Sequence, residues 1–133
     1  MPHIHGSFDV ALKPQPHIDG VGDPGIGRMA ISKQFHGDLE AESKGEMIAA
    51  SSDVKGSAGY VAMERVVGTM LGKRGTFVLQ HSSTMNRGEP TQSITVVPDS
   101  GTDELTGLSG SMTITIIEKK HLYDFTFTLH KAH

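Results

Sequence analysis

Apolar and polar residues alternate with a period of two along most of the chain, and this pattern predicts β-strands rather than helices. Residues 7–13 place Phe8, Val10 and Leu12 on one face. A longer alternating run spans residues 28–42, and Gly45 is expected to interrupt the β-structure that follows it. One face of that run carries Met29, Ile31, Lys33, Phe35, Gly37 and Leu39. Further short strands are predicted at residues 93–97 and around Met112–Ile116 and Tyr123–Leu129.

The clearest predicted element is a hairpin made of residues 60–71 and 76–85. Two runs rich in β-branched and apolar residues flank Gly72-Lys73-Arg74-Gly75, which predicts a short glycine-bounded loop. With Gly72 opposite Gly75, Val66 lies across from His81 and Glu64 lies across from Ser83. A helix over residues 60–71 is the alternative, because Ala, Met, Glu and Arg favour helix. The valine pair, Gly68 and the strand that follows disfavour it.

This register places Glu64 and His81 as diagonal neighbours on one face of the hairpin. The same face is otherwise mostly apolar, so we expect it to point into the protein and to carry the two polar groups with it. Its other members are Tyr60, Ala62, Val66, Met70, Phe77, Leu79, Ser83 and Met85. An inverted register would instead place Arg65 and Gln80 inside.

Seven or eight short strands joined by short connections predict an all-β fold, either a barrel or a sandwich. The 16 glycines agree with many turns. We expect one domain over residues 1–133 that forms a small closed antiparallel barrel of about eight strands. A barrel of that size has room for its own side chains or for one small ligand.

Composition and charge exclude several classes of function. The chain has no cysteine, which excludes disulfides and thiolate chemistry, and its formal net charge of −3 comes without any cluster of Lys or Arg. We therefore expect no nucleic-acid partner and no membrane association. The first residues lack the basic and apolar segments of a signal peptide, so a cytoplasmic protein is predicted.

Glu64 and His81 are the candidate functional pair. A carboxylate and an imidazole inside an apolar barrel could transfer protons to a bound molecule, could bind it without chemistry, or could be an internal pair that sets the strand register, with Lys33 as a further partner. The predicted ligand-binding residues are Lys33, Tyr60, Glu64, Phe77, Leu79, His81 and Met85. No cofactor is predicted.

His36, Asp38 and Glu40 lie at alternate positions of the predicted 28–42 strand and superficially resemble a metal site. Residues on one face of a strand stand nearly 7 Å apart, at about 3.3 Å rise per residue, so three of them do not converge on one ion. We interpret them as a solvated acidic face and predict no metal site.

Several separated segments resemble a bacterial family catalogued only as a domain of unknown function, number 3224. The matching segments are residues 33–40, 56–66, 75–85, 96–105 and 107–110. The resemblance implies a barrel similar to allene oxide cyclase, with eight antiparallel strands and a homo-oligomeric assembly. It implies no established activity, and no catalytic residue of the plant cyclases can be matched to a position of this chain.

Three functions are consistent with these features. The first is a barrel that binds a small apolar ligand, with Glu64 and His81 in its lumen. The second is a cyclase or isomerase that uses the same pair as acid and base, and the third is a structural oligomeric protein with a filled core. A cavity of a few hundred Å3 in the lumen would favour the first two.

Overall fold

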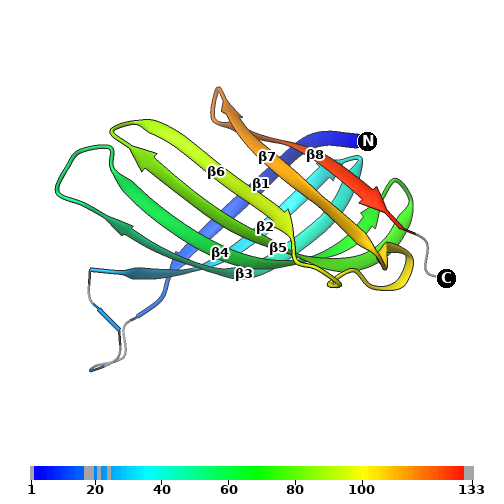
Figure 1. The fold of residues 1–133 in the computed structure, drawn as a ribbon, viewed down its shortest axis with the longest axis horizontal. Coiled ribbons are helices and arrows are strands. Elements are labelled where there is room, and N and C mark those ends of the chain that lie inside the picture. Colours follow the sequence, from blue (N-terminus) through cyan, green and yellow to red (C-terminus); the bar gives the residue numbers. More distant parts are fainter. Residues whose placement is uncertain (1, 17–19, 21, 24, 131–133) are drawn as a thin grey trace.

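The computed structural model describes residues 2–16, 20, 22–23 and 25–130. Eight strands in this part of the chain follow one another around a closed antiparallel barrel, each pairing with the next and β8 pairing with β1 (Figure 1). The strands are β1 (His3–Pro14), β2 (Gly27–Gly37), β3 (Leu39–Ser51), β4 (Ala58–Met70), β5 (Lys73–Asn86), β6 (Glu89–Val96), β7 (Leu108–Ile117) and β8 (Lys120–Leu129). The predicted all-β barrel is confirmed. The short 3₁₀ helix η1 (Asp103–Leu105) lies between β6 and β7. No helix among the described residues is long and apolar enough to cross a membrane.

The predicted register of the β4–β5 hairpin is wrong. The chain reverses at Leu71 and Gly72, whose φ angles of 50° and 81° suit a two-residue type I′ turn, so Lys73 already pairs with Met70. Glu64 therefore lies opposite Leu79, and His81 lies opposite Ala62. The register shifts by an even number of residues, so each side chain keeps its face. Glu64 and His81 are still diagonal neighbours, and both are buried.

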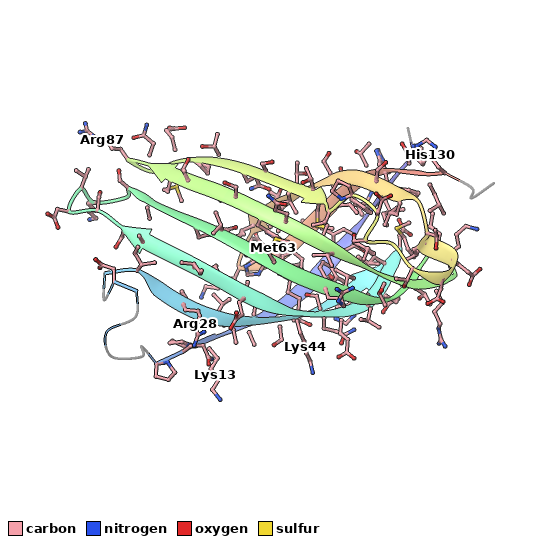
Figure 2. The ribbon with its side chains drawn as sticks, turned by 60° about the horizontal axis from the view of Figure 1, so that its bottom comes forward. Lys13, Arg28, Lys44, Met63, Arg87 and His130 are labelled. Atoms are coloured by element: carbon pink, nitrogen blue, oxygen red, sulfur yellow. The ribbon has the colours of Figure 1, made fainter. Side chains whose placement is uncertain are left out.

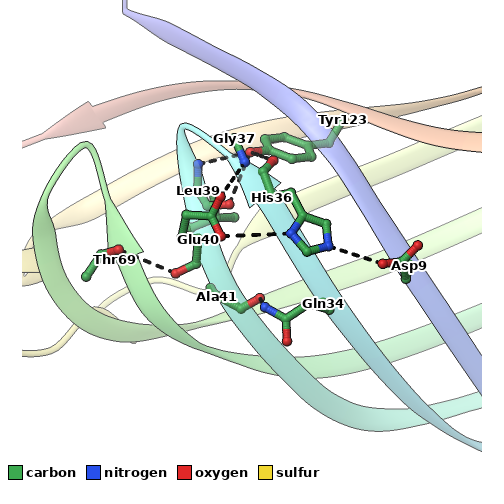
Figure 3. Close-up of polar contacts among 9 residues, drawn as sticks. All are labelled: Asp9, Gln34, His36, Gly37, Leu39, Glu40, Ala41, Thr69 and Tyr123. Atoms are coloured by element: carbon green, nitrogen blue, oxygen red, sulfur yellow. Dashed lines mark hydrogen bonds and ion pairs between the residues drawn. The ribbon is translucent and has the colours of Figure 1, made fainter.

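The single run predicted over residues 28–42 is in fact two strands. β2 ends at Gly37 (φ 104°), and β3 begins at Leu39 and pairs back along β2. The hydroxyl of Tyr123 on β8 accepts a hydrogen bond from the Leu39 N–H at 3.0 Å and donates one to the His36 carbonyl at 2.9 Å (Figure 3). A buried side chain from a distant strand thus holds the reversal, which strand periodicity alone does not reveal.

β3 also runs unbroken through Gly45, contrary to the expected interruption. Gly45 pairs with Glu64 on β4, and a Cβ atom at this position would collide with the Met63 carbonyl oxygen. This glycine therefore serves the close approach of two strands and does not end one.

Aromatic side chains fill one end of the barrel. Phe77 and Phe125 stack with ring centroids 6.0 Å apart, and Phe35 meets Tyr123 edge-on at 5.6 Å. Leu105 of η1 is buried in the same core. Outward positions alternate with these, as shown by Lys44 on β3 and Met63 on β4 in Figure 2.

β6 and β7 form the shortest pairing of the barrel. Among the described residues they pair only at Ile94 with Met112 and at Thr95 with Ser111. Beyond these pairs the Gln92 side chain bridges the two strands. Its Oε1 accepts a hydrogen bond from the Ile114 N–H at 2.7 Å, and its Nε2 donates to the Ile114 carbonyl at 3.3 Å. One side-chain amide thus replaces a pair of backbone hydrogen bonds.

Candidate functional site

Four polar side chains are buried in the lumen and form one row. Lys33, Ser43, Glu64 and His81 come from β2, β3, β4 and β5, which are adjacent in the barrel. Each lies on the inward face because of the period of two along its strand. Antiparallel pairing then places Lys33 opposite Ser43, with Glu64 and His81 one diagonal step further on each strand.

The Glu64 carboxylate lies at the centre of this row. Its Oε2 accepts a hydrogen bond from Lys33 Nζ at 2.9 Å, and its Oε1 accepts one from Ser43 Oγ at 2.9 Å. Burial by itself would raise the pKa of Glu64, but the adjacent imidazole of His81 and the charge of Lys33 outweigh burial and lower this pKa to about 2. Glu64 is therefore an anion at neutral pH, paired with the Lys33 cation.

His81 makes a short contact that is not a well-aligned hydrogen bond. Its Nε2 lies 2.8 Å from Glu64 Oε2, yet Nε2 has no hydrogen-bond partner of acceptable geometry among the described residues. The distance alone indicates an ion pair, whereas the orientation of the ring shows that an N–H at Nε2 does not point at the carboxylate. Because hydrogen bonds weaken steeply as they bend, this contact is a close electrostatic approach and not a strong hydrogen bond. A buried donor in His81 is thus left without an aligned acceptor.

A cavity of about 250 Å3 lies on the other side of this row from the aromatic core. Lys33 and His81 line it at the level of the row, and Tyr60 and His121 line it as well. The rest of its wall is apolar and includes Val10, Ile31, Met47, Ala62, Ile114 and Ile116. The lumen is therefore filled in one half and hollow in the other, with the polar row between them.

The predicted ligand-binding residues divide between these two halves. Lys33, Tyr60 and His81 line the cavity, and Glu64 is buried in the row beside it. Phe77 and Leu79 belong to the aromatic core and do not line the cavity. Met85 is 42% exposed near the end of β5 and is not part of the cavity wall.

Sequence reasoning missed Ser43 and most of the cavity wall. Ser43 occupies an inward position of β3, two residues beyond the buried Ala41, so the alternation contained a signal for it once β3 is recognised as a separate strand. Phe8 from β1, Ile114 from β7 and His121 from β8 join the wall only because the barrel closes. No local pattern identifies such distant neighbours.

His36, Asp38 and Glu40 do not gather around one point. His36 Nε2 contacts Asp9 Oδ2 at 3.1 Å on the outer surface, and His36 Nδ1 lies 3.9 Å from Glu40 Oε2 (Figure 3). The Asp38 carboxylate instead accepts a hydrogen bond from the backbone of His5 at 3.3 Å. Within the described residues, no group of three or more His, Asp or Glu side chains could hold a metal ion.

A larger hollow, of about 500 Å3, lies at the β7–β8 turn. Its wall includes Asp9, Glu118, Lys119 and Lys120, which are exposed. Charged and solvated side chains of this kind shape a surface depression but do not exclude water from a ligand. The smaller lumen cavity has the apolar wall that is typical of ligand sites.

Comparison with known proteins supports the resemblance found in the sequence. The model of a family described as "Protein of unknown function (DUF3224)" matches residues 4–127. The chain belongs to this family. A crystal structure of a DUF3224 protein with unknown function from Shewanella oneidensis MR-1 is 48% identical, covers 99% of both chains and superposes with a TM-score of 0.92. A search of curated proteins found no match. Membership in the DUF3224 family thus supports the barrel and leaves the function to be argued from the site.

Proposed function

We propose that the protein binds a small, largely apolar molecule in the hollow half of its lumen. The observation that carries this proposal is the cavity of about 250 Å3 whose apolar wall ends at the buried row of Lys33, Glu64 and His81. For scale, an engineered apolar cavity of about 150 Å3 binds benzene. The volume therefore suits a molecule of one ring with a substituent.

A small residue beside the row, Ala62, supports binding over a filled core. Ala62 lines the cavity and lies directly opposite His81. The other side of the row is packed with Phe35, Phe77 and Leu79. The chain thus packs large side chains on one side of the polar row and places an alanine next to His81 on the other.

The charge state of Glu64 favours binding over acid–base catalysis by the Glu64–His81 pair. A carboxylate with a pKa of about 2 is a weak base, and its oxygens already accept hydrogen bonds from Lys33 and Ser43. General bases work best when their pKa lies near the working pH. The cyclase or isomerase hypothesis thus receives less support from the geometry than ligand binding does.

Four further predictions are part of this proposal. They are a relation to allene oxide cyclase-like barrels, a homo-oligomeric state, a cytoplasmic location and a single domain over residues 1–133. Sedimentation, for example, measures the number of subunits directly.

The binding proposal is tested with toluene as the probe and with methyl NMR signals as the readout. We expect toluene to shift the methyl signals of Ile31, Met47 and Ile114, which line the cavity. Ala62→Leu places three additional carbon atoms in the cavity and should weaken toluene binding at least about tenfold, since one buried methylene is worth about 0.8 kcal/mol. Ala62→Val is a milder version in case the larger residue strains the core.

Val61→Leu is the matched control, because Val61 is the next residue along β4 and is 52% exposed on the outer face. It should leave toluene binding unchanged. The proposal is contradicted if toluene leaves the cavity methyl groups unshifted, or if Val61→Leu weakens binding as much as Ala62→Leu does. Native mass spectrometry of protein taken from its host would then identify any retained small molecule.

A further inference from the structure

The polar groups that reach the cavity are hydrogen-bond donors with bonding capacity left over. Lys33 Nζ carries three N–H groups and makes one hydrogen bond, to Glu64, while it also lies 4.9 Å from the centre of the Phe8 ring. His81 Nε2 is buried without an aligned partner among the described residues. Nε2 lies only 2.8 Å from the Glu64 anion, and two acceptor atoms repel each other at that distance, so we assign the ring proton to Nε2.

The Glu64 carboxylate already accepts hydrogen bonds from the protein. Both oxygens of Glu64 accept hydrogen bonds, Oε1 from Ser43 and Oε2 from Lys33. No carboxylate lines the cavity among the described residues, and its titratable lining groups are Lys33, Tyr60, His81 and His121. A ligand that supplied only donors would leave His81 Nε2 and the remaining N–H groups of Lys33 without an acceptor. A ligand that supplies an acceptor would satisfy the donors that the protein leaves unpaired.

We propose that the ligand is an apolar molecule with one carboxylate group, and that this carboxylate binds at the polar row against the protonated form of His81. The inference rests on the proposed binding of a small molecule in the lumen and specifies the chemical class of that molecule. Its basis is the buried His81 donor at the end of a cavity whose wall is mostly apolar.

Charge balance supports a single negative charge on the ligand. Lys33 and Glu64 form one ion pair, so they neutralise each other. A ligand carboxylate and a protonated His81 form a second pair, and the buried site stays neutral. An ammonium ligand would leave one buried positive charge unpaired, and a dianion would leave a negative one; buried charges without partners are costly.

A bound carboxylate adds a negative charge beside His81 and so favours the charged form of the imidazole. The titratable groups that face His81 in the cavity region are Glu64 and Tyr60 from β4, Lys33 from β2 and His121 from β8, whereas β6 presents Ile94. The affinity for the carboxylate should therefore rise as the pH falls, by at most about tenfold for each pH unit.

The test compares three probes of the same shape by calorimetry between pH 8 and pH 6. They are 4-methylbenzoate, 4-methylbenzamide and 4-methylbenzylamine, which carry a negative, a neutral and a positive group. We expect 4-methylbenzoate to bind at least about tenfold more tightly than the amide at pH 6, with an affinity that increases as the pH falls. The amide should show no such pH dependence, and the amine should bind least tightly.

Two variants separate His81 from other histidines. His81→Gln keeps an N–H donor but cannot be protonated, so 4-methylbenzoate should lose its pH dependence while the amide still binds. His36→Gln is the control, because His36 lies on the outer surface and contacts Asp9. It should retain the wild-type pH dependence.

The outcomes distinguish the two proposals. If the amide and the benzoate bind equally at every pH, or if the amine binds most tightly, the carboxylate inference is overturned and lumen binding stands. If none of the three probes binds and toluene does not bind either, both proposals are overturned.

Discussion

Glu64 is the residue on which the interior of the barrel depends most. Its side chain is fully buried, and it neutralises a lysine whose own side chain is only 6% exposed. A buried ion pair contributes little when compared with a well-packed apolar pair, but removal of one partner leaves the other as an uncompensated charge. The polar row should therefore tolerate loss of the whole pair better than loss of half of it.

We expect Glu64→Gln to lower the free energy of unfolding by about 3–5 kcal/mol, because Lys33 then stays buried without a counter-charge. The double variant Lys33→Met, Glu64→Leu should recover most of that loss. Urea denaturation measures both. Glu46→Gln is the control: it removes an exposed ion pair with Arg28, at 3.9 Å, and should cost less than about 1 kcal/mol. Equal losses at Glu64 and Glu46 would contradict the interpretation.

The pH dependence of stability follows from the same carboxylate. The pKa of Glu64 is about 2 in the folded protein against an ordinary value of 4.5. The ionised form stabilises the fold fully above about pH 4.5, and this contribution, roughly 3 kcal/mol, is lost as the pH falls towards 2. Wild type and the Lys33→Met, Glu64→Leu variant should therefore differ in the slope of unfolding free energy between pH 5 and pH 2. Parallel slopes would show that Glu64 does not titrate in this way.

At the scale of strands, β3 and β4 approach each other closely next to the row. Gly45 permits this approach, since a Cβ atom there would meet the Met63 carbonyl oxygen and lie 2.6 Å from Glu64 Cα. The position of Glu64 therefore depends on a residue with no side chain in the neighbouring strand.

Gly45→Ala should push β3 away from β4 and lower the free energy of unfolding by about 1–3 kcal/mol, the usual range for overpacking. Gly59→Ala is a matched control in β4, because its Cβ would have its nearest contact at 3.6 Å. That substitution should be neutral or slightly stabilising, since alanine restricts the unfolded chain. Chemical denaturation of the two variants decides the matter, and similar losses for both would argue against a special role of Gly45.

Strand faces were predictable from the sequence, whereas strand partners were predictable only in part. The alternation around Glu64 and His81 assigned both residues to the interior correctly. The register of their hairpin failed because Leu71 adopts a left-handed conformation that glycine or asparagine adopts more readily, so Gly72-Lys73-Arg74-Gly75 looked like the better loop. The β2–β3 reversal was missed because a distant hydroxyl, that of Tyr123, stabilises it.

For the whole molecule, closure of the barrel determines the cavity, and closure is a property that no segment of the sequence contains. Lys33, Glu64 and His81 could be proposed as internal groups because each follows the alternation of its own strand. The division of the lumen into a filled and a hollow half could not. This division depends on whether the side chains of β1, β7 and β8 lie on one side of the polar row or the other. Their position follows from the stagger of strands that are distant in the sequence.

Closure between β6 and β7 relies on Gln92, and this can be measured. Gln92→Ala removes the acceptor of the Ile114 N–H and should speed hydrogen exchange at that amide about fivefold, which corresponds to loss of one hydrogen bond of about 1 kcal/mol. Gln80→Ala, an exposed glutamine on β5, should leave exchange at Ile114 unchanged. Unaltered exchange in Gln92→Ala would mean that the two strands stay joined without this side chain.

The separation of a filled half from a hollow half also bears on how freely such a protein can diverge. Substitutions among Phe35, Phe77 and Phe125 affect a packed core, where a large-to-small change typically costs about 3–5 kcal/mol. Substitutions at Ile31, Met47 or Ile114 change the wall of a space that is already open. The hollow half can therefore vary in shape while the aromatic half preserves the fold. Related barrels could in this way come to accept different molecules through a handful of positions, with the scaffold left intact.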